Sequence, residues 1–254
     1  MKSRKHISID VNYSPSLIDE MSLKDKNLVV IDVLRASTTV AAALHNGAKE
    51  IIPVNSIDGV VKISSSLFGG VTLRAGERNG KMIAGFNLGN SPIEYTEELV
   101  KGKSIILLTT NGSVTMVKGR YAKNLVIAGF VNLSAVVDFL FELKSDVVIL
   151  CAGKENHFCM EDAVCAGRII NHLQAKFDTE LVLNDAAAAS TILDKEHGKN
   201  ILRMLKNTDH GKYLTEIGFA DDLKACAIID AFPVLPMLSG NVIRAAKSNN
   251  SHSS

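Results

Sequence analysis

The chain has 254 residues, of which 46% are hydrophobic and 22% charged, a composition that suits a folded globular protein and excludes disordered and collagen-like chains. Its 28 Lys and Arg residues nearly balance 27 Asp and Glu residues, so the net charge of +1 supplies no basic field for a nucleic-acid backbone. Aromatic residues make up only 5% and include no Trp, which disfavours stacking against single-stranded bases. We therefore expect no nucleic-acid partner.

The N-terminal segment, the apolar runs and the cysteines indicate the cellular compartment of the protein. Residues 1–12 are basic but lack the apolar run of about 7 to 15 residues that a secretory signal needs. The longest apolar stretch, near Val147–Leu150, falls far short of the roughly 20 residues that cross a bilayer. The cysteines at positions 151, 159, 165 and 226 are too sparse for a disulfide scaffold and lack structural zinc spacing. These features predict a cytoplasmic enzyme or binding protein without a membrane partner.

Short apolar runs rich in Val and Ile predict five strands: Leu28–Val33, Glu50–Val54, Ser104–Leu108, Asn124–Ala128 and Val147–Leu150. The runs do not alternate with polar residues, which is typical of strands that helices cover on both faces. We expect an α/β fold with a largely parallel central sheet covered by helices and with a mostly helical C-terminal third.

Helical patterns lie between these strands. Ala36–Asn46 and Asn132–Lys144 have the apolar spacing of amphipathic helices. A further helix is expected from Ser91, with Pro92 at its first position and Glu94 completing a capping box.

Helical windows dominate the C-terminal third before an extended piece at Ala227–Pro236; they cover Asp185–Glu196, Lys199–Lys206 and Leu214–Cys226. Because no low-complexity linker interrupts the chain, we expect one α/β domain over residues 1–246. Packing of residues 185–226 as a helical subdomain is the alternative. Residues 247–254 are polar and are predicted to form a disordered tail.

Ligands of open parallel sheets bind at the carboxyl ends of the strands, so site residues are expected in the loops that follow the strands. The first loop, residues 32–39, reads DVLRASTT. Asp32 and Arg35 before a helix N-terminus could hold a metal ion and an anion together. A structural alternative is equally open, in which Ser37 caps the helix and Asp32 pairs with Arg35.

Two further loops carry polar groups. One offers the hydroxyls, side-chain amide and backbone amides of a small anion cradle: Thr109, Thr110, Asn111, Gly112 and Ser113. Its alternative is a simple Thr/Asn turn. In the other, Glu161 and Asp162 open a helix, where acids complement the helix dipole but could also bind Mg²⁺. We expect Cys159 and Cys165, which flank this pair, to be packing residues.

Residues 76–92 combine glycines with charged side chains. Four glycines within 14 residues, together with Glu77 and Arg78, predict a long irregular loop with a function. A disordered surface flap is the alternative.

Five segments in order resemble the 2-phosphosulfolactate phosphatase family: DVLRASTT at 32–39, GERNG at 76–80, GFNLGNSP at 85–92, TTNGS at 109–113, and CAG at 151–153 with ED at 161–162. The resemblance implies an α/β enzyme of coenzyme M biosynthesis. Its reaction would be the Mg²⁺-dependent hydrolysis of the phosphate ester of 2-phospho-3-sulfolactate to 3-sulfolactate and phosphate.

The resemblance also implies roles for individual residues. The catalytic residues would be Asp32 and Arg35, and the Mg²⁺ ligands would be Asp32, Glu77, Glu161 and Asp162. A small multi-anionic substrate would be bound by Arg78, Asn90, Ser91, Thr109, Thr110, Asn111, Gly112 and Ser113. A metal and a fixed arginine are the groups that best meet charge on a transferring phosphoryl group. Whether Asp32 acts as nucleophile, base or metal ligand stays open, as does a homo-oligomeric state.

The chain departs from the family pattern at Asn87, Val114, Asn156 and Cys159, where an acid, an arginine, a glycine and a serine are usual. By the resemblance, Asn87 replaces a candidate metal ligand or base, and Val114 puts a contact with a substrate anion in doubt. The alternatives are a non-catalytic binding protein for a phosphorylated or sulfonated acid, a phosphatase of a related 2-phospho acid, or phosphoryl transfer to an acceptor other than water.

Overall fold

The computed structural model describes residues 6–66 and 72–246, so the predicted tail lies outside the described residues. Within these ranges one sheet has the strand order β5-β4-β6-β3-β11-β10-β7-β2-β8-β1-β9. Its strands are β1 Ser8–Asn12, β2 Asn27–Ile31, β3 Glu50–Val54, β4 Thr72–Arg78, β5 Lys81–Met82, β6 Ser104–Leu108, β7 Asn124–Ala128, β8 Val147–Cys151, β9 Val182–Leu183, β10 Pro236–Ser239 and β11 Val242–Ala245.

The expected α/β fold is confirmed, and the apolar runs explain it. Strand β2 is parallel to both of its neighbours, with Val29 opposite Val126 of β7 and Ile149 of β8. Val29 and Ile31 belong to one apolar core, and Leu28 and Val30 belong to another. Since side chains alternate along a strand, two cores require cover on both faces of the sheet.

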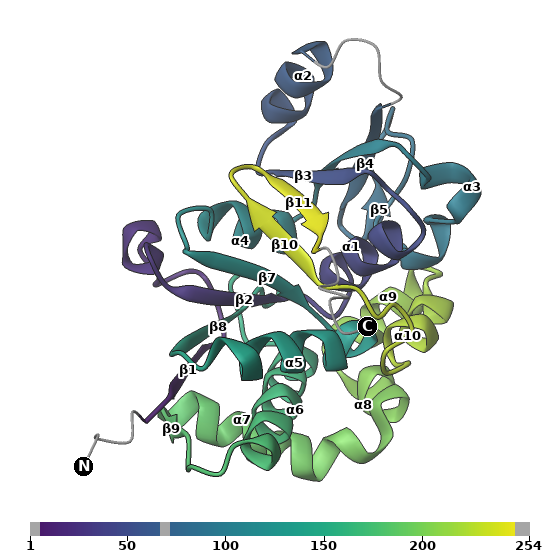
Figure 1. The fold of residues 1–254 in the computed structure, drawn as a ribbon. Coiled ribbons are helices and arrows are strands. Elements are labelled where there is room, and N and C mark those ends of the chain that lie inside the picture. The colour runs from purple at the N-terminus through teal and green to yellow at the C-terminus, as the bar shows by residue number, and fades with distance from the viewer. Residues whose placement is uncertain (1–5, 67–71, 247–254) are drawn as a thin grey trace, which may run out of the picture.

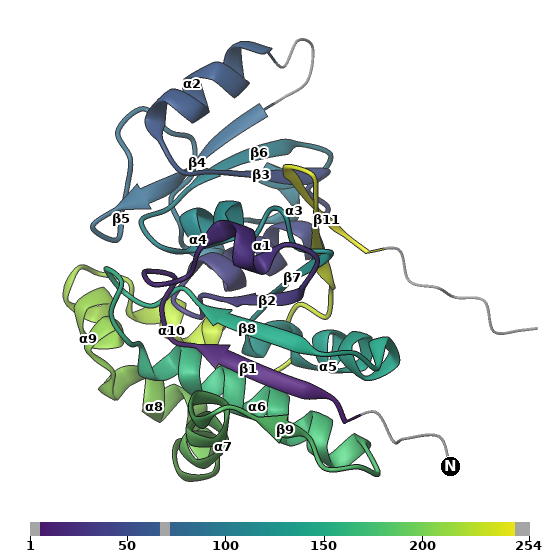
Figure 2. The same cartoon turned by 90° about the vertical axis from the view of Figure 1, so that its left-hand side faces the viewer.

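The helices are α1 Ala36–His45, α2 Ile57–Ser66, α3 Glu97–Val100, α4 Gly112–Lys118, α5 Leu133–Leu143, α6 Met160–Lys176, α7 Asp185–His197, α8 Ile201–Asn207, α9 Asp209–Glu216 and α10 Ala220–Cys226. The mostly helical C-terminal third is confirmed. Leu205, Leu214 and Leu223 from this third share a core cluster with β1, β2, β7 and β8. In Figure 2, α9 and α10 lie at the end of the sheet toward which the arrowheads of β1 and β8 point. No helix of the described chain is long and apolar enough to span a membrane.

Two helix predictions were wrong in detail. The segment from Ser91 forms only a short 3-10 turn over Pro92–Glu94, and Ser91 makes no capping hydrogen bond with its side chain. Glu94 accepts a hydrogen bond from Gly89 N instead (2.6 Å). The window Leu214–Cys226 is broken between α9 and α10, where Gly218 takes φ +97°, a conformation that favours glycine.

The extended piece near the C-terminus was also placed wrongly. It begins only at Pro236 and forms the antiparallel hairpin β10–β11, which lies between β7 and β3 and joins two parallel sections of the sheet (Figure 1). Met237 is opposite Val126, and Ile243 is opposite Ile51. A loop over residues 240–241, Gly followed by Asn, connects the strands and is a recognised hairpin signal.

The expected irregular loop of residues 76–92 is partly regular. Strand β4 continues through Arg78, and Arg78 is opposite Lys81 of β5. Residues 79–80 make the turn, with φ +49° at Asn79 and +71° at Gly80. The hairpin directs Glu77, which is buried, toward the polar loops at the carboxyl ends of the neighbouring strands.

Candidate active site

The loops at the carboxyl ends of β2, β4, β6 and β8 converge with α9 on a small cavity of about 150 Å³. Its walls combine acids, bases and amides: Asp32, Leu34, Arg35, Glu77, Asn79, Gly80, Asn90, Thr110, Asn111, Lys154, Glu155, His210, Tyr213 and Leu214. Several residues predicted separately from the sequence are therefore brought together. Lys154, Glu155 and His210 also line a second cavity of about 1010 Å³, so the two spaces adjoin.

Asp32 follows β2 and is almost fully buried. Its Oδ1 accepts a hydrogen bond from Ala36 N at the start of α1 (3.2 Å). A Cβ at Gly112 would lie 2.4 Å from Asp32 Oδ2, so only glycine lets α4 begin this close to the carboxylate. Burial raises the pKa of Asp32 from 3.8 to about 6; the neighbouring Glu77 and Glu161 carboxylates add to the rise, and His210 opposes it.

The structural alternative for this loop is wrong, because Arg35 does not pair with Asp32. Its Nη1 donates to Oδ2 of Asp222 (2.5 Å), and its Nη2 donates to the carbonyl of Gly80 (2.6 Å). The guanidinium also lies 4.3 Å from the ring centre of Phe219. Nor does Ser37 cap the helix, since its Oγ accepts a hydrogen bond from Asp32 N (2.9 Å).

Asp222, on α10, was not predicted as a site residue. Its second oxygen, Oδ1, accepts from Ser91 Oγ (2.6 Å), so the hydroxyl of Ser91 is engaged within the protein. Asn90, the preceding residue, lines the small cavity, and its Oδ1 is buried without a hydrogen-bond partner in the described chain. Asn90 is therefore available to a ligand through its side chain, whereas Ser91 supports the wall.

The predicted cradle of residues 109–113 likewise contains some residues that are engaged within the protein and others that line the cavity. Thr109 N donates to Ser113 Oγ (2.8 Å), and Ser113 N donates to Thr109 Oγ1 (2.8 Å), so these two residues close a turn. Gly112 is buried against Asp32. Thr110 and Asn111 line the cavity, and Asn111 Oδ1 accepts from Glu155 N (3.1 Å).

Glu77 and Asp162 each connect two loops. Glu77 Oε1 accepts from Thr110 N (2.7 Å), and its Oε2 accepts from Gly80 N (2.9 Å). Asp162 Oδ1 accepts from Val33 N (2.9 Å), and its Oδ2 accepts from Gly153 N (3.1 Å). Both oxygens of each carboxylate thus already bind backbone amides.

Asp162 and Arg78 lie in opposite surroundings, because Asp162 is buried beside other carboxylates and Arg78 is exposed. Burial, together with the carboxylates of Asp32 and Glu161, raises the pKa of Asp162 well above its ordinary value. Arg78 is exposed, donates to the carbonyl of Glu77 (3.1 Å) and does not line either described cavity.

Glu161 has a different environment from its neighbour Asp162. Its Oε1 lies 3.2 Å from Nδ1 of His210, and its Oε2 is buried without a hydrogen-bond partner among the described residues. His210 comes from α9, 49 residues later in the chain. No local spacing connects the two residues, so sequence periodicity could not have paired them.

A family model described as 2-phosphosulpholactate phosphatase matches residues 12–241. A protein named "Probable 2-phosphosulfolactate phosphatase" from Caldanaerobacter subterraneus subsp. tengcongensis is 39% identical over 230 residues, 91% of this chain and 95% of that protein. One of the same name from Synechocystis sp. is 39% identical over 242 residues, 94% of this chain and 100% of its own.

The chain belongs to the 2-phosphosulfolactate phosphatase family. Its enzyme class is therefore that of the phosphoric monoester hydrolases, and the resemblance carried by the five segments is confirmed. The family match also extends past Asp222, so it includes α10 and also α9, which lines the small cavity.

None of the four departures from the family pattern lines the small cavity. Asn87 is exposed, and its Oδ1 accepts from Arg74 N (2.9 Å). Asn156 has φ +66°, a left-handed conformation that Asn tolerates better than most residues, so it can replace a glycine there. Val114, on α4, is half-buried. Cys159, the fourth departure, precedes α6 and makes no side-chain cap.

Two of the four predicted acids, Asp32 and Glu161, each keep one carboxylate oxygen that could bind a Mg²⁺ ion. No hydrogen bond within the described chain engages Asp32 Oδ2 or Glu161 Oε2, whereas Glu77 and Asp162 are committed to backbone amides. Mg²⁺ usually takes one or two carboxylates and fills its other positions with water and phosphate oxygens. The four predicted acids do not form a single compact ligand group in the described chain.

Proposed function

We propose that this protein hydrolyses the phosphate ester of 2-phospho-3-sulfolactate to 3-sulfolactate and phosphate, with Mg²⁺, in the cytoplasm and as a step of coenzyme M biosynthesis. The substrate is the one named for the relatives that match nearly the whole chain. The observation that supports the metal dependence is a pair of carboxylate oxygens without a hydrogen bond in the described chain: Asp32 Oδ2, on a buried residue, and the buried atom Glu161 Oε2.

In this proposal Asp32 and Glu161 hold the ion. When bound, Mg²⁺ supplies positive charge to the phosphoryl oxygens as the ester bond breaks. Glu77 and Asp162 position the loops, because each fixes two backbone amides from different segments. The two roles agree with the hydrogen bonds of the adjacent acids. Asp162 has both oxygens bound to backbone amides, whereas Glu161 has one oxygen without a partner in the described chain.

The anionic groups of the substrate would meet the polar wall opposite these acids. Lys154 supplies a cation there, and its Nζ lies 4.5 Å from the ring centre of Tyr213. Thr110, Asn111 and Asn90 offer uncharged polar groups along the same wall. The guanidinium of Arg35 borders the cavity while bound to Asp222, so its position is fixed before a substrate arrives.

The test measures phosphate release from a panel of 2-phospho acids, with Mg²⁺ and after chelation. We expect release from 2-phospho-3-sulfolactate, its loss on chelation and its recovery when Mg²⁺ is restored. Glu161→Gln should abolish the response to Mg²⁺, whereas Glu196→Gln, an exposed acid on the wall of the larger cavity, should keep it. Binding of the substrate without any phosphate release would indicate a binding protein and overturn the proposal.

A further inference from the structure

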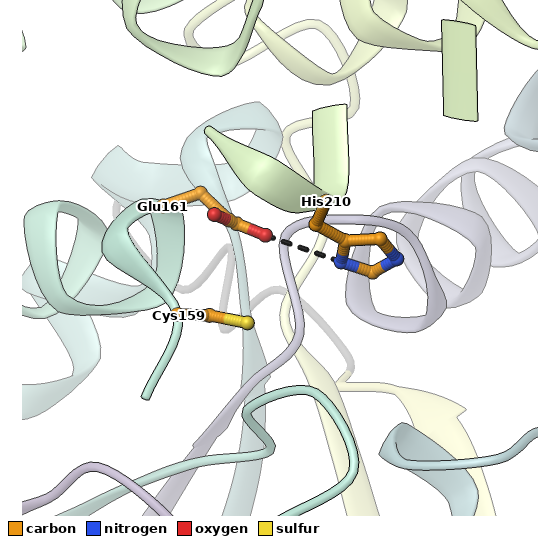
Figure 3. A group of neighbouring side chains, drawn as sticks. All are labelled: Cys159, Glu161 and His210. Atoms are coloured by element: carbon orange, nitrogen blue, oxygen red, sulfur yellow. Dashed lines mark hydrogen bonds and ion pairs between the residues drawn. The ribbon is translucent and has the colours of Figure 1, made fainter. Parts of the chain in front are cut away.

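Three side chains with different donor atoms meet where the larger cavity approaches Asp32. Cys159 and Glu161 come from the start of α6, and His210 comes from the first turn of α9 (Figure 3). A sulfur, an oxygen and a nitrogen from these residues all lie within 4.8 Å of one another. In the described chain this is the one group of three or more His, Cys, Asp or Glu side chains close enough to share a metal ion.

We infer that Cys159, Glu161 and His210 form a binding site for a borderline-soft divalent cation of the Zn²⁺ type. Zn²⁺ in enzymes is commonly held by three protein ligands, with a fourth position left for water or substrate. Zinc–ligand bonds of about 2.0 to 2.3 Å imply ligand separations of roughly 3.3 to 3.8 Å in a tetrahedral arrangement. Side-chain adjustments of about an ångström would therefore close the site.

Burial at Glu161 is a second, independent observation. The residue is 1% exposed, and its Oε2 has no hydrogen-bond partner in the described chain. A buried acceptor without a partner is costly, and a bound cation would satisfy it. Figure 3 shows the carboxylate of Glu161 directed toward the ring of His210, with the thiol of Cys159 on the same side.

Nearby charge favours a cation at this place. The carboxylates of Asp32 and Asp162 both interact electrostatically with Glu161. The buried guanidinium of Arg35 does not offset them, because it is paired with Asp222. The contribution of a thiolate to the ligand set then selects among cations, since sulfur prefers Zn²⁺ and similar ions to Mg²⁺.

The fourth position of such an ion would be accessible from the larger cavity. All three ligands line this cavity, and Lys154, Lys199 and Arg203 lie on its walls. An anion attracted by these cations could reach the open position. Binding would replace the S–H bond of Cys159 with a metal–sulfur bond and release one proton to solvent. The inference deepens the proposed function, because Glu161 belongs to both sites and the two cations would compete for it.

The test uses Co²⁺ as a spectroscopic substitute for Zn²⁺ on the full chain freed of metal. We expect one Co²⁺ per chain, with the sulfur-to-cobalt charge-transfer absorption that a thiolate ligand produces, and displacement of Co²⁺ by Zn²⁺. Cys159→Ser should remove the charge-transfer absorption and weaken Zn²⁺ binding by at least about a hundredfold. Cys165→Ala, which removes another buried thiol from α6, should retain both.

A second variant covers the case in which Cys159→Ser fails to fold. His210→Gln on α9 should also weaken Zn²⁺ binding, whereas His197→Gln, on the wall of the same cavity, should not. Absence of the charge-transfer absorption in the parent protein, or its persistence in Cys159→Ser, would overturn the inference. Neither result bears on phosphate release with Mg²⁺, so failure of this site and failure of the proposed function are separately visible.

Discussion

The guanidinium of Arg35 is bound to the carboxylate of Asp222, 187 residues later in the chain, with Nη1 and Oδ2 2.5 Å apart. Both side chains are at most 2% exposed. The pair connects the loop after β2 to α10, and Ser91 Oγ joins it through the other oxygen of Asp222. The wall of the small cavity thus depends on a contact between distant parts of the chain.

Asp222→Asn should destabilise the protein strongly. It leaves the buried guanidinium of Arg35 without a counter-charge, which typically costs about 3 to 5 kcal/mol in the free energy of unfolding. Urea unfolding measures the loss. The matched control is Asp221→Asn, since Asp221 is exposed and pairs with Lys224 on the surface of the same helix. Similar unfolding midpoints for the two variants would contradict this account.

Asp32→Asn should stabilise the metal-free protein at neutral and higher pH. The pKa of Asp32 rises from 3.8 to about 6 on folding, so the folded state holds this proton more tightly than the unfolded state. Its contribution to the free energy of unfolding therefore falls as pH rises through this interval, by at most about 3 kcal/mol. Asparagine removes the ionisation.

Thermal unfolding of the two proteins across a pH series tests this expectation. The gain in Tm for Asp32→Asn should be present above about pH 6 and should shrink toward about pH 4, where the parent carboxyl is protonated in the folded state. A parent protein more stable than the variant at high pH, without metal, would show that the charged form is favoured in the fold.

The adjacent acids Glu161 and Asp162 should respond differently to amide substitution. Glu161→Gln should fold normally and lose on the order of a hundredfold or more in kcat, because it removes a metal ligand. Asp162→Asn should affect kcat much less, because both oxygens of Asp162 bind the amides of Val33 and Gly153. Loss of one of these acceptors costs about 1 to 3 kcal/mol, and removal of a buried group with a raised pKa opposes that loss at neutral pH.

Measurement of kcat and Tm for both variants separates these roles. If the acids only complement the dipole of α6, each change would cost about 0.3 to 1 kcal/mol and leave kcat nearly intact. That outcome for Glu161→Gln would remove Glu161 from the active site.

Gly112→Ala should displace Asp32 and reduce kcat together with stability. The added Cβ would lie 2.4 Å from both Asp32 Oδ2 and Ala36 Cβ, distances that require α1 and α4 to separate. The control is Gly129→Ala, where the nearest atom to the new Cβ is Thr38 Oγ1 at 3.6 Å and no positive φ is involved. Equal effects on kcat in the two variants would contradict the steric explanation.

Local sequence predicted the centre of the sheet and the loops of the site. The unbroken apolar runs at β2, β3, β6, β7 and β8 are all strands, because burial on both faces leaves a pattern within five residues. Polar residues following them, such as Asp32 and Thr110, do line one cavity. These features depend on near neighbours in the chain.

Residues that depend on distant contacts were not predictable in the same way. Asp222 and His210 enter the site from helices whose own sequences show only ordinary amphipathic patterns. Nor does sequence reveal that Asp162 is committed to two backbone amides while Glu161 retains an unpartnered oxygen. That difference arises only when the loops after β2 and β8 are brought together.

The hairpin β10–β11 affects how this sheet can be assembled during synthesis. One parallel section carries Glu77 and the turn that begins at Thr109, and the other carries Asp32 and leads into Glu161. The strands that pair with both sections leave the ribosome after every other strand described here. Such pairing over long sequence separations is slow. The nascent chain should therefore expose the facing edges of β3 and β7 until its last strands arrive, and chaperone binding or misassociation should concentrate on those edges.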